Sequence, residues 1–110
     1  MNIGGFDFEN TENTLIIAEI SANHNQDIEV AKKTISEIKK SGANCVKLQT
    51  YTPDTLTIDS DKDDFKIKDS IWKGKSLFSL YNEAYTPWEW HKELFSFAKK
   101  EGLICFSSPF

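Results

Sequence analysis

The sequence lacks several features that mark large classes of proteins. No apolar run in its 110 residues approaches the roughly 20 that a membrane-spanning helix requires, so no membrane association is expected. The opening MNIGGFDFENTENT has no basic segment followed by an apolar one, so no secretion signal is expected. The two cysteines, Cys45 and Cys105, are far apart and form no CxxC motif. This usage predicts buried free thiols in a cytoplasmic protein, without a disulfide or a zinc site.

A concentration of positive charge is also missing. The formal net charge is −4, and the lysines are dispersed, with no run longer than a pair. A nucleic-acid-binding surface would need a basic patch or stripe, so no nucleic-acid partner is expected. The chain also has no Gly-rich phosphate loop, no HExxH motif and no Ser/His/Asp constellation.

A strand–helix alternation is present instead. Apolar segments at 14–21 (TLIIAEIS), 46–51 (VKLQTY) and 103–108 (LICFSS) each predict a buried strand. The apolar spacing in 27–42 and 86–102 predicts two helices between them. Short helix-to-strand joints and apolar strands are typical of an α/β fold with parallel strands and right-handed crossover helices.

Local signals mark the ends of both helices. Asp27 is suited to cap the first helix, and Gly42 stands where a left-handed residue ends it. Thr86 and Glu89 predict a capping box for the second helix, with Pro87 at its first position.

The segment 52–85 interrupts the alternation with polar and aromatic residues. Its acidic cluster at 59–64 is expected to be a solvated loop, and SLFSLYNEAY at 76–85 to be a short helix. A closed (β/α)8 barrel has eight strands and takes about 250 residues. The present sequence predicts only three strands connected by two crossover helices. We therefore expect residues 1–110 to form an N-terminal fragment of a larger α/β protein.

Polar residues lie near the ends of the predicted strands, where parallel α/β folds bind ligands. Lys47 and Gln49 share one face of the second strand, and Glu19 near the end of the first can face Lys47. One interpretation is an ion pair with only a structural role. The other is an anion site, in which Lys47 attracts a phosphate or carboxylate, Gln49 donates hydrogen bonds and Ser107 or Ser108 adds a hydroxyl.

The two histidines are weaker candidates. His24, in the NHN loop after the first strand, could serve as a metal ligand or a base. Flanked by asparagines, it more often orders a loop through hydrogen bonds, and we favour that interpretation. His91 is expected on the surface of the second helix.

Four segments together resemble one family: IIAEISANHN, GANCVKLQTYTPDTLT, WKGKSLFSLYNEAYTPWEWH and GLICFSSPF. They are similar to the sialic acid synthases, which condense phosphoenolpyruvate with an N-acylated amino sugar. The third segment resembles the pseudaminate branch rather than the neuraminate branch. The resemblance implies the N-terminal part of a TIM barrel, with the family's C-terminal antifreeze-like domain absent from residues 1–110.

The resemblance also implies a reaction. Phosphoenolpyruvate, water and 2,4-diacetamido-2,4,6-trideoxy-L-altrose would give pseudaminic acid and phosphate, for cell-surface or flagellar glycans. The alternatives are an N-acetylneuraminate or legionaminate synthase, or a non-catalytic fragment of such an enzyme. The parent protein would be a cytoplasmic, C–C bond-forming transferase and a homodimer, while these 110 residues alone would be inactive.

The resemblance also implies roles for individual residues within the matching segments. Glu19 resembles the active-site glutamate that ends the first strand, and Lys47 resembles a lysine that contacts phosphoenolpyruvate. Gln49 resembles a glutamine near the reacting sugar carbonyl. Ser108 stands where relatives often have threonine, and it keeps the hydroxyl that contacts phosphoenolpyruvate.

The resemblance places the divalent metal, Mn²⁺ or Mg²⁺, on histidines of later strands, so no metal ligand is expected in this chain. Neither histidine here corresponds to those ligands. The aromatic residues Tyr81 and Tyr85 are candidates for the rim that holds the sugar. The alternative is that these aromatics only pack the 52–85 segment onto the barrel.

Overall fold

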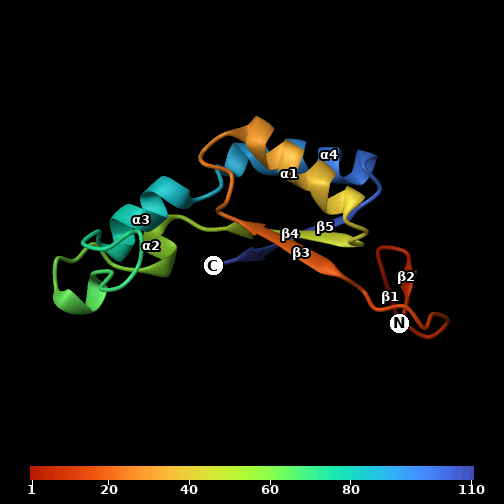
Figure 1. Ribbon diagram of the computed structural model, residues 1–110, viewed down its shortest axis with the longest axis horizontal. Helices are drawn as coiled ribbons and strands as arrows, with labels where there is room; N and C mark the ends of the chain where they lie inside the picture. Colours follow the sequence, from red (N-terminus) through yellow and green to blue (C-terminus); the bar gives the residue numbers. More distant parts are fainter.

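The computed structural model describes residues 1–110, and a three-stranded parallel sheet lies at its centre (Figure 1). The sheet order is β3 (Ile17–Ser21), β4 (Cys45–Thr50) and β5 (Ile104–Pro109), with β4 paired in parallel to both neighbours. The parallel α/β arrangement predicted from the sequence is therefore confirmed.

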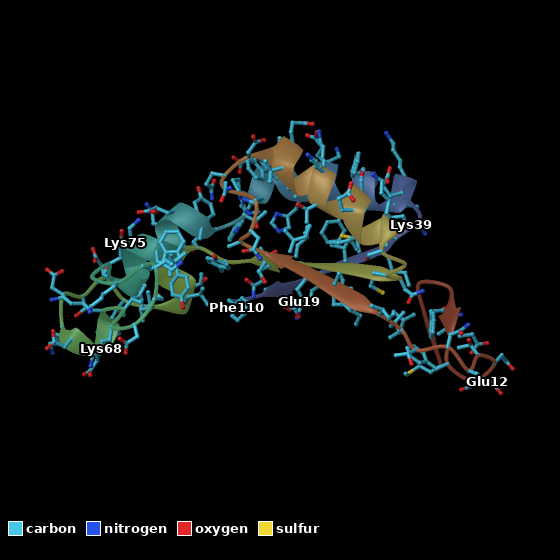
Figure 2. All side chains as sticks on the ribbon, viewed as in Figure 1. Glu12, Glu19, Lys39, Lys68, Lys75 and Phe110 are labelled. Atoms are coloured by element: carbon cyan, nitrogen blue, oxygen red, sulfur yellow. The ribbon has the colours of Figure 1, made fainter.

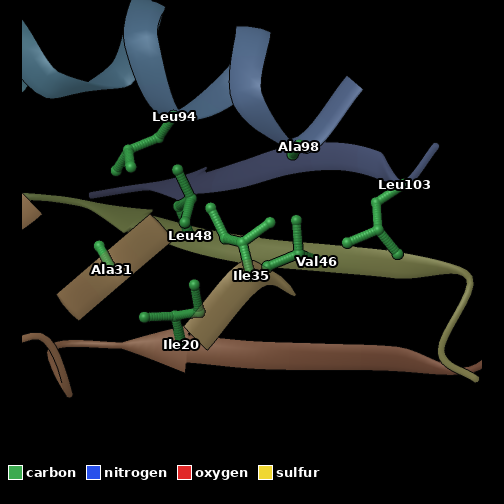
Figure 3. Close-up of a cluster of buried hydrophobic side chains, with 8 residues drawn as sticks. All are labelled: Ile20, Ala31, Ile35, Val46, Leu48, Leu94, Ala98 and Leu103. Atoms are coloured by element: carbon green, nitrogen blue, oxygen red, sulfur yellow. The ribbon is translucent and has the colours of Figure 1, made fainter. Parts of the chain in front are cut away.

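Two helices, α1 (Ile28–Lys40) and α4 (His91–Lys100), cover one face of this sheet (Figure 1). Between helices and sheet lies a cluster of eight buried side chains (Figure 3). Its members are Ile20, Ala31, Ile35, Val46, Leu48, Leu94, Ala98 and Leu103. Because strand side chains alternate, the burial of Val46 and Leu48 on this side sends Lys47 and Gln49 to the other side.

The predicted ends of α1 are confirmed. The Asp27 carboxylate accepts hydrogen bonds from the backbone N–H groups of Glu29 and Val30. Gly42, just beyond the helix, has φ of +90°, a conformation that costs a glycine little.

The predicted start of the second helix is wrong. A 3₁₀ turn, η2 (Trp88–Trp90), precedes α4, which begins at His91. The Thr86 hydroxyl is bonded to His24 and does not cap the helix, so the capping box does not form. The burial of Thr86, 1% exposed, explains this difference, since its hydroxyl needs a partner inside the protein.

The 52–85 segment contains α2 (Pro53–Leu56), the 3₁₀ turn η1 (Asp63–Phe65) and α3 (Leu77–Ala84). The predicted short helix is therefore confirmed. The acidic residues at 59–64 are exposed, as expected of a solvated loop. A small antiparallel hairpin of β1 (Asn2–Ile3) and β2 (Phe6–Asp7) opens the chain and was not predicted.

The face of the sheet opposite α1 and α4, here called the open face, carries no helix (Figure 1). The radius of gyration is 16.4 Å, against about 13 Å for a compact domain of this length. Ile17 of β3 is 44% exposed although it belongs to a strand. Side chains of the open face are therefore accessible. None of the helices has the length and hydrophobicity that a membrane-spanning segment needs.

Candidate active site

Strand register brings the four predicted site residues to the open face. Glu19 of β3 lies opposite Lys47 of β4, and Gln49 of β4 lies opposite Ser108 of β5. Figure 2 labels Glu19 on the side of the sheet away from the helices. The four side chains thus belong to one surface near the carboxyl ends of adjacent parallel strands, where such folds bind ligands.

Lys47 and Glu19 form an ion pair. Lys47 Nζ lies 2.5 Å from Glu19 Oε1, and the two side chains are 24% and 49% exposed. The pair predicted from the sequence is therefore present, and both side chains are accessible within these 110 residues. An ammonium has three N–H donors, so Lys47 can keep this partner and still bind an incoming anion.

The two adjacent serines of β5 face opposite sides of the sheet. Ser107 Oγ lies 2.7 Å from Thr50 Oγ1, which lies 2.6 Å from Nε2 of His91 on α4. This chain of contacts is on the helix side, so Ser108 is the serine of the open face. The expectation of a simple surface position for His91 is wrong, because its ring joins the start of α4 to the end of β4.

A β-bulge shapes the end of β3. The register with β4 shifts between Glu19 and Ser21, and Ser21 has φ of +53°. Such bulges re-aim side chains and occur often beside active sites. The loop that follows contains two further residues in the left-handed conformation, Asn25 and Gln26.

His24 holds that loop in place. Its side chain is 1% exposed, and its Nδ1 accepts a hydrogen bond from the Gln26 backbone N–H at 3.2 Å. The proton therefore lies on Nε2, which donates to Thr86 Oγ1 at 3.0 Å. The ring also packs edge-to-face on Trp90, with centroids 5.3 Å apart. The interpretation of His24 as a loop-ordering residue is confirmed.

Burial lowers the pKa of His24 from its ordinary value of 6.5. As pH falls below this value the unfolded chain binds the proton first, so the free energy of unfolding should fall. We expect the wild type to be more stable than His24→Gln at neutral pH, by about 1–3 kcal/mol. Urea unfolding should show this advantage shrinking between about pH 7 and pH 5. An advantage that stayed constant over this range would contradict the assignment.

A cavity of about 270 Å³, here called the α3 pocket, opens between α3 and the strand ends. It is lined by Ala22, Asn23, Gln49, Tyr51, Trp72, Leu80, Tyr81 and Ala84. Of the two predicted rim residues, Tyr81 lines this pocket and Tyr85 does not. The backbone carbonyl of Tyr85 instead accepts a hydrogen bond from the Gln26 side chain.

Sequence reasoning missed two residues of the α3 pocket, Tyr51 and Trp72. Tyr51 follows Lys47 and Gln49 at the same two-residue spacing, and this alternation was an available signal. Trp72 had no such signal, because it enters the pocket only through the folding of the 52–85 segment.

Comparison with known proteins identifies the family. The model of the NeuB family matches residues 34–110. The chain belongs to the NeuB family. It is 51% identical to the pseudaminic acid synthase of Campylobacter jejuni over 110 residues, which are the whole chain and 32% of that protein. It is 54% identical to the pseudaminic acid synthase of Helicobacter pylori over 95 residues, 86% of the chain and 28% of that protein.

More distant NeuB relatives include the N,N'-diacetyllegionaminic acid synthase of C. jejuni, 34% identical over 98 residues. That match covers 88% of the chain and 29% of the synthase. The chain thus spans about a third of the length of the relatives it matches. Among solved structures, the N-acetylneuraminic acid synthetase of Leptospira borgpetersenii has the same fold, with a TM-score of 0.67 and 23% identity. The alignment covers 87% of this chain and 29% of that one.

No metal site forms within these 110 residues of the NeuB fold. No three His, Cys, Asp or Glu side chains come together in an arrangement that would hold an ion. Both histidines are engaged with neighbouring residues. Cys45 and Cys105 are free thiols; Cys45 is buried as predicted, whereas Cys105 is only partly buried. Desolvation nevertheless raises the pKa of Cys105 to about 11. The thiol therefore stays protonated and is a poor metal ligand.

Proposed function

We propose that this chain forms the N-terminal third of a pseudaminic acid synthase. The observation that carries the proposal is its 51% identity, over all 110 residues, to such a synthase. Identity to the legionaminic acid synthase of C. jejuni is lower, at 34%. The accessible polar residues of the open face provide side chains that could bind the substrates of such a synthase.

The proposed reaction joins phosphoenolpyruvate to open-chain 2,4-diacetamido-2,4,6-trideoxy-L-altrose. C3 of phosphoenolpyruvate forms a bond to the aldehyde carbon, whose oxygen takes up a proton. Water then adds at C2 and loses a proton. Cleavage of the C2–O bond releases phosphate and leaves the keto group of the product, pseudaminic acid.

Lys47 and Ser108 would bind phosphoenolpyruvate. The Lys47 ammonium offsets its negative charge and holds the enol in position, and the Ser108 hydroxyl donates a hydrogen bond to the same substrate. Fixed charges of this kind stabilise a transition state because they need no reorganisation during the reaction. The ion pair with Glu19 fixes the direction of the ammonium before substrate binds.

Glu19 and Gln49 would act on the reacting carbons. The Glu19 carboxylate accepts the proton that the attacking water loses, a general-base role. The Gln49 side chain forms no hydrogen bond within the chain, so its amide can donate to the sugar carbonyl.

We also propose that a divalent metal, Mn²⁺ or Mg²⁺, serves the complete enzyme. The residues of this chain do not fit such an ion, so its ligands would lie outside residues 1–110. We further propose a cytoplasmic homodimer. The free thiols of Cys45 and Cys105 support a reducing compartment.

The test is a condensation assay on the full-length synthase that carries this chain. Phosphate release would be measured with phosphoenolpyruvate and each of three sugars: the diacetamido-trideoxy-altrose, the legionaminate precursor and N-acetylmannosamine. We expect turnover with the first. Turnover of N-acetylmannosamine alone would contradict the proposal.

A further inference from the structure

The α3 pocket has a composition suited to part of a ligand rather than to a whole one. Its volume of about 270 Å³ is below the roughly 300–1,000 Å³ typical of sites that enclose a complete small molecule. Six of its eight lining residues are hydrophobic. It adjoins the open face through Gln49, so a ligand held beside Lys47 could extend one substituent into it.

Several polar groups of this apolar wall have no hydrogen-bond partner in the chain, and those of Tyr51 and Gln49 are among them. The Tyr51 side chain is 3% exposed, yet its hydroxyl makes no hydrogen bond to another residue. Every fully buried polar side-chain atom has a hydrogen-bond partner. The unbonded Tyr51 hydroxyl is therefore not fully buried, and it must reach the cavity surface. The Gln49 amide lies in the same wall and is also unbonded. Both groups can be reached from the cavity, so a ligand that enters it can take the place of water as their hydrogen-bond partner.

Tyr51 is suited to donate. Burial and the neighbouring Tyr81 raise the pKa of the Tyr51 hydroxyl above its ordinary value of 10.0. The two rings pack edge-to-face with centroids 5.8 Å apart, which fixes the position of Tyr51. Tyr51 therefore presents a protonated hydroxyl, while Gln49 can both donate and accept.

We infer that the α3 pocket binds one acetamido substituent of the amino sugar. Tyr51 and Gln49 would hydrogen-bond to its amide, and the walls formed by Leu80 and Ala84 of α3 would contact its methyl group. The inference rests on the proposed function and adds the residues that select an N-acetylated sugar. An unacylated amine would leave an ammonium against apolar walls, which is unfavourable.

No cation of this chain lines the α3 pocket, so it is not suited to the phosphate of phosphoenolpyruvate. Lys75 lies 5.3 Å from the centre of the Trp72 ring, but it does not line the pocket and is paired with Glu83. We therefore assign anion binding to Lys47, and the binding of an uncharged group to the α3 pocket.

The inference is tested by placing a larger side chain in the wall of the α3 pocket in the full-length synthase. Ala84→Leu adds three carbons to the pocket wall, and Asn82→Leu places a leucine on the exposed side of the same helix. Binding of the diacetamido-trideoxy-altrose would be measured by calorimetry. We expect affinity to fall about tenfold or more in Ala84→Leu and to stay within about twofold in Asn82→Leu.

Two further measurements keep the inference falsifiable if Ala84→Leu folds poorly. Tyr51→Phe removes only the hydroxyl and should weaken binding by about three- to tenfold. The indole N–H resonance of Trp72, assigned with Trp72→Phe, should shift when the acetamido sugar is added and not when its unacylated amine is added.

The outcomes separate this inference from the proposed function. A Trp72 shift without condensation would support the pocket and contradict the proposed reaction. Condensation together with undiminished sugar affinity in Ala84→Leu and Tyr51→Phe would overturn the pocket and leave the reaction standing. A missing Trp72 shift would also overturn the pocket.

Discussion

Lys47→Met is expected to lower kcat/KM for phosphoenolpyruvate by about 100- to 1,000-fold in the full-length synthase. The substitution keeps much of the aliphatic side chain and removes the ammonium. The anionic substrate then loses its main attractive charge in this chain, and Glu19 loses the partner 2.5 Å away. Steady-state phosphate release at varied phosphoenolpyruvate concentration would measure the loss, with KM rising and kcat falling.

The matched control for Lys47→Met is Lys33→Met. Lys33 is exposed on α1, on the opposite side of the sheet, and forms no ion pair. We expect its kinetic constants to match those of the wild type. Unchanged affinity and turnover in Lys47→Met would show that the proposed role of Lys47 is wrong.

Glu19→Gln is expected to lower kcat by about 100-fold or more, with a smaller change in the KM for phosphoenolpyruvate. Glutamine has nearly the same shape, but its amide cannot accept the proton of the attacking water. Glu19 lies on the open face and is not part of the core between the sheet and α1 and α4, so the neutral side chain should be tolerated by the fold. Single-turnover kinetics would separate a slower chemical step from weaker binding.

Glu29→Gln serves as the control for Glu19→Gln. Glu29 also pairs with a lysine, Lys32 at 2.7 Å, but on α1. Lys32 also pairs with Glu93 on the helix side of the sheet, so loss of its contact with Glu29 should leave kcat unchanged. If Glu19→Gln retained full kcat, Glu19 would serve only to hold Lys47.

The sequence predicted the three parallel strands and α1 correctly because their signals are local. Side-chain alternation in β4 placed Lys47 and Gln49 on one face, and the apolar spacing in α1 identified its buried side. Asp27 and Gly42 marked its ends because each makes its own contact or turn with nearby backbone.

The missed features depend on contacts between distant segments. Thr86 failed as a cap because its hydroxyl is bonded to His24, 62 residues away in the sequence. His91 contacts Thr50 across 41 residues. The α3 pocket requires the 52–85 segment to fold over the end of β4, and no periodic pattern encodes that packing. The choice between Ser107 and Ser108 likewise needed the strand register.

The central claim is that substrates bind on the open face, and the two adjacent serines of β5 test it most directly. The measurement is the phosphoenolpyruvate dissociation constant of Ser108→Ala and Ser107→Ala, compared by calorimetry in the full-length synthase. Ser108 faces the open side opposite Gln49, whereas Ser107 is bonded to Thr50 beneath α4. We predict about three- to tenfold weaker binding in Ser108→Ala and no change in Ser107→Ala. Weaker binding in Ser107→Ala with none lost in Ser108→Ala would contradict the account.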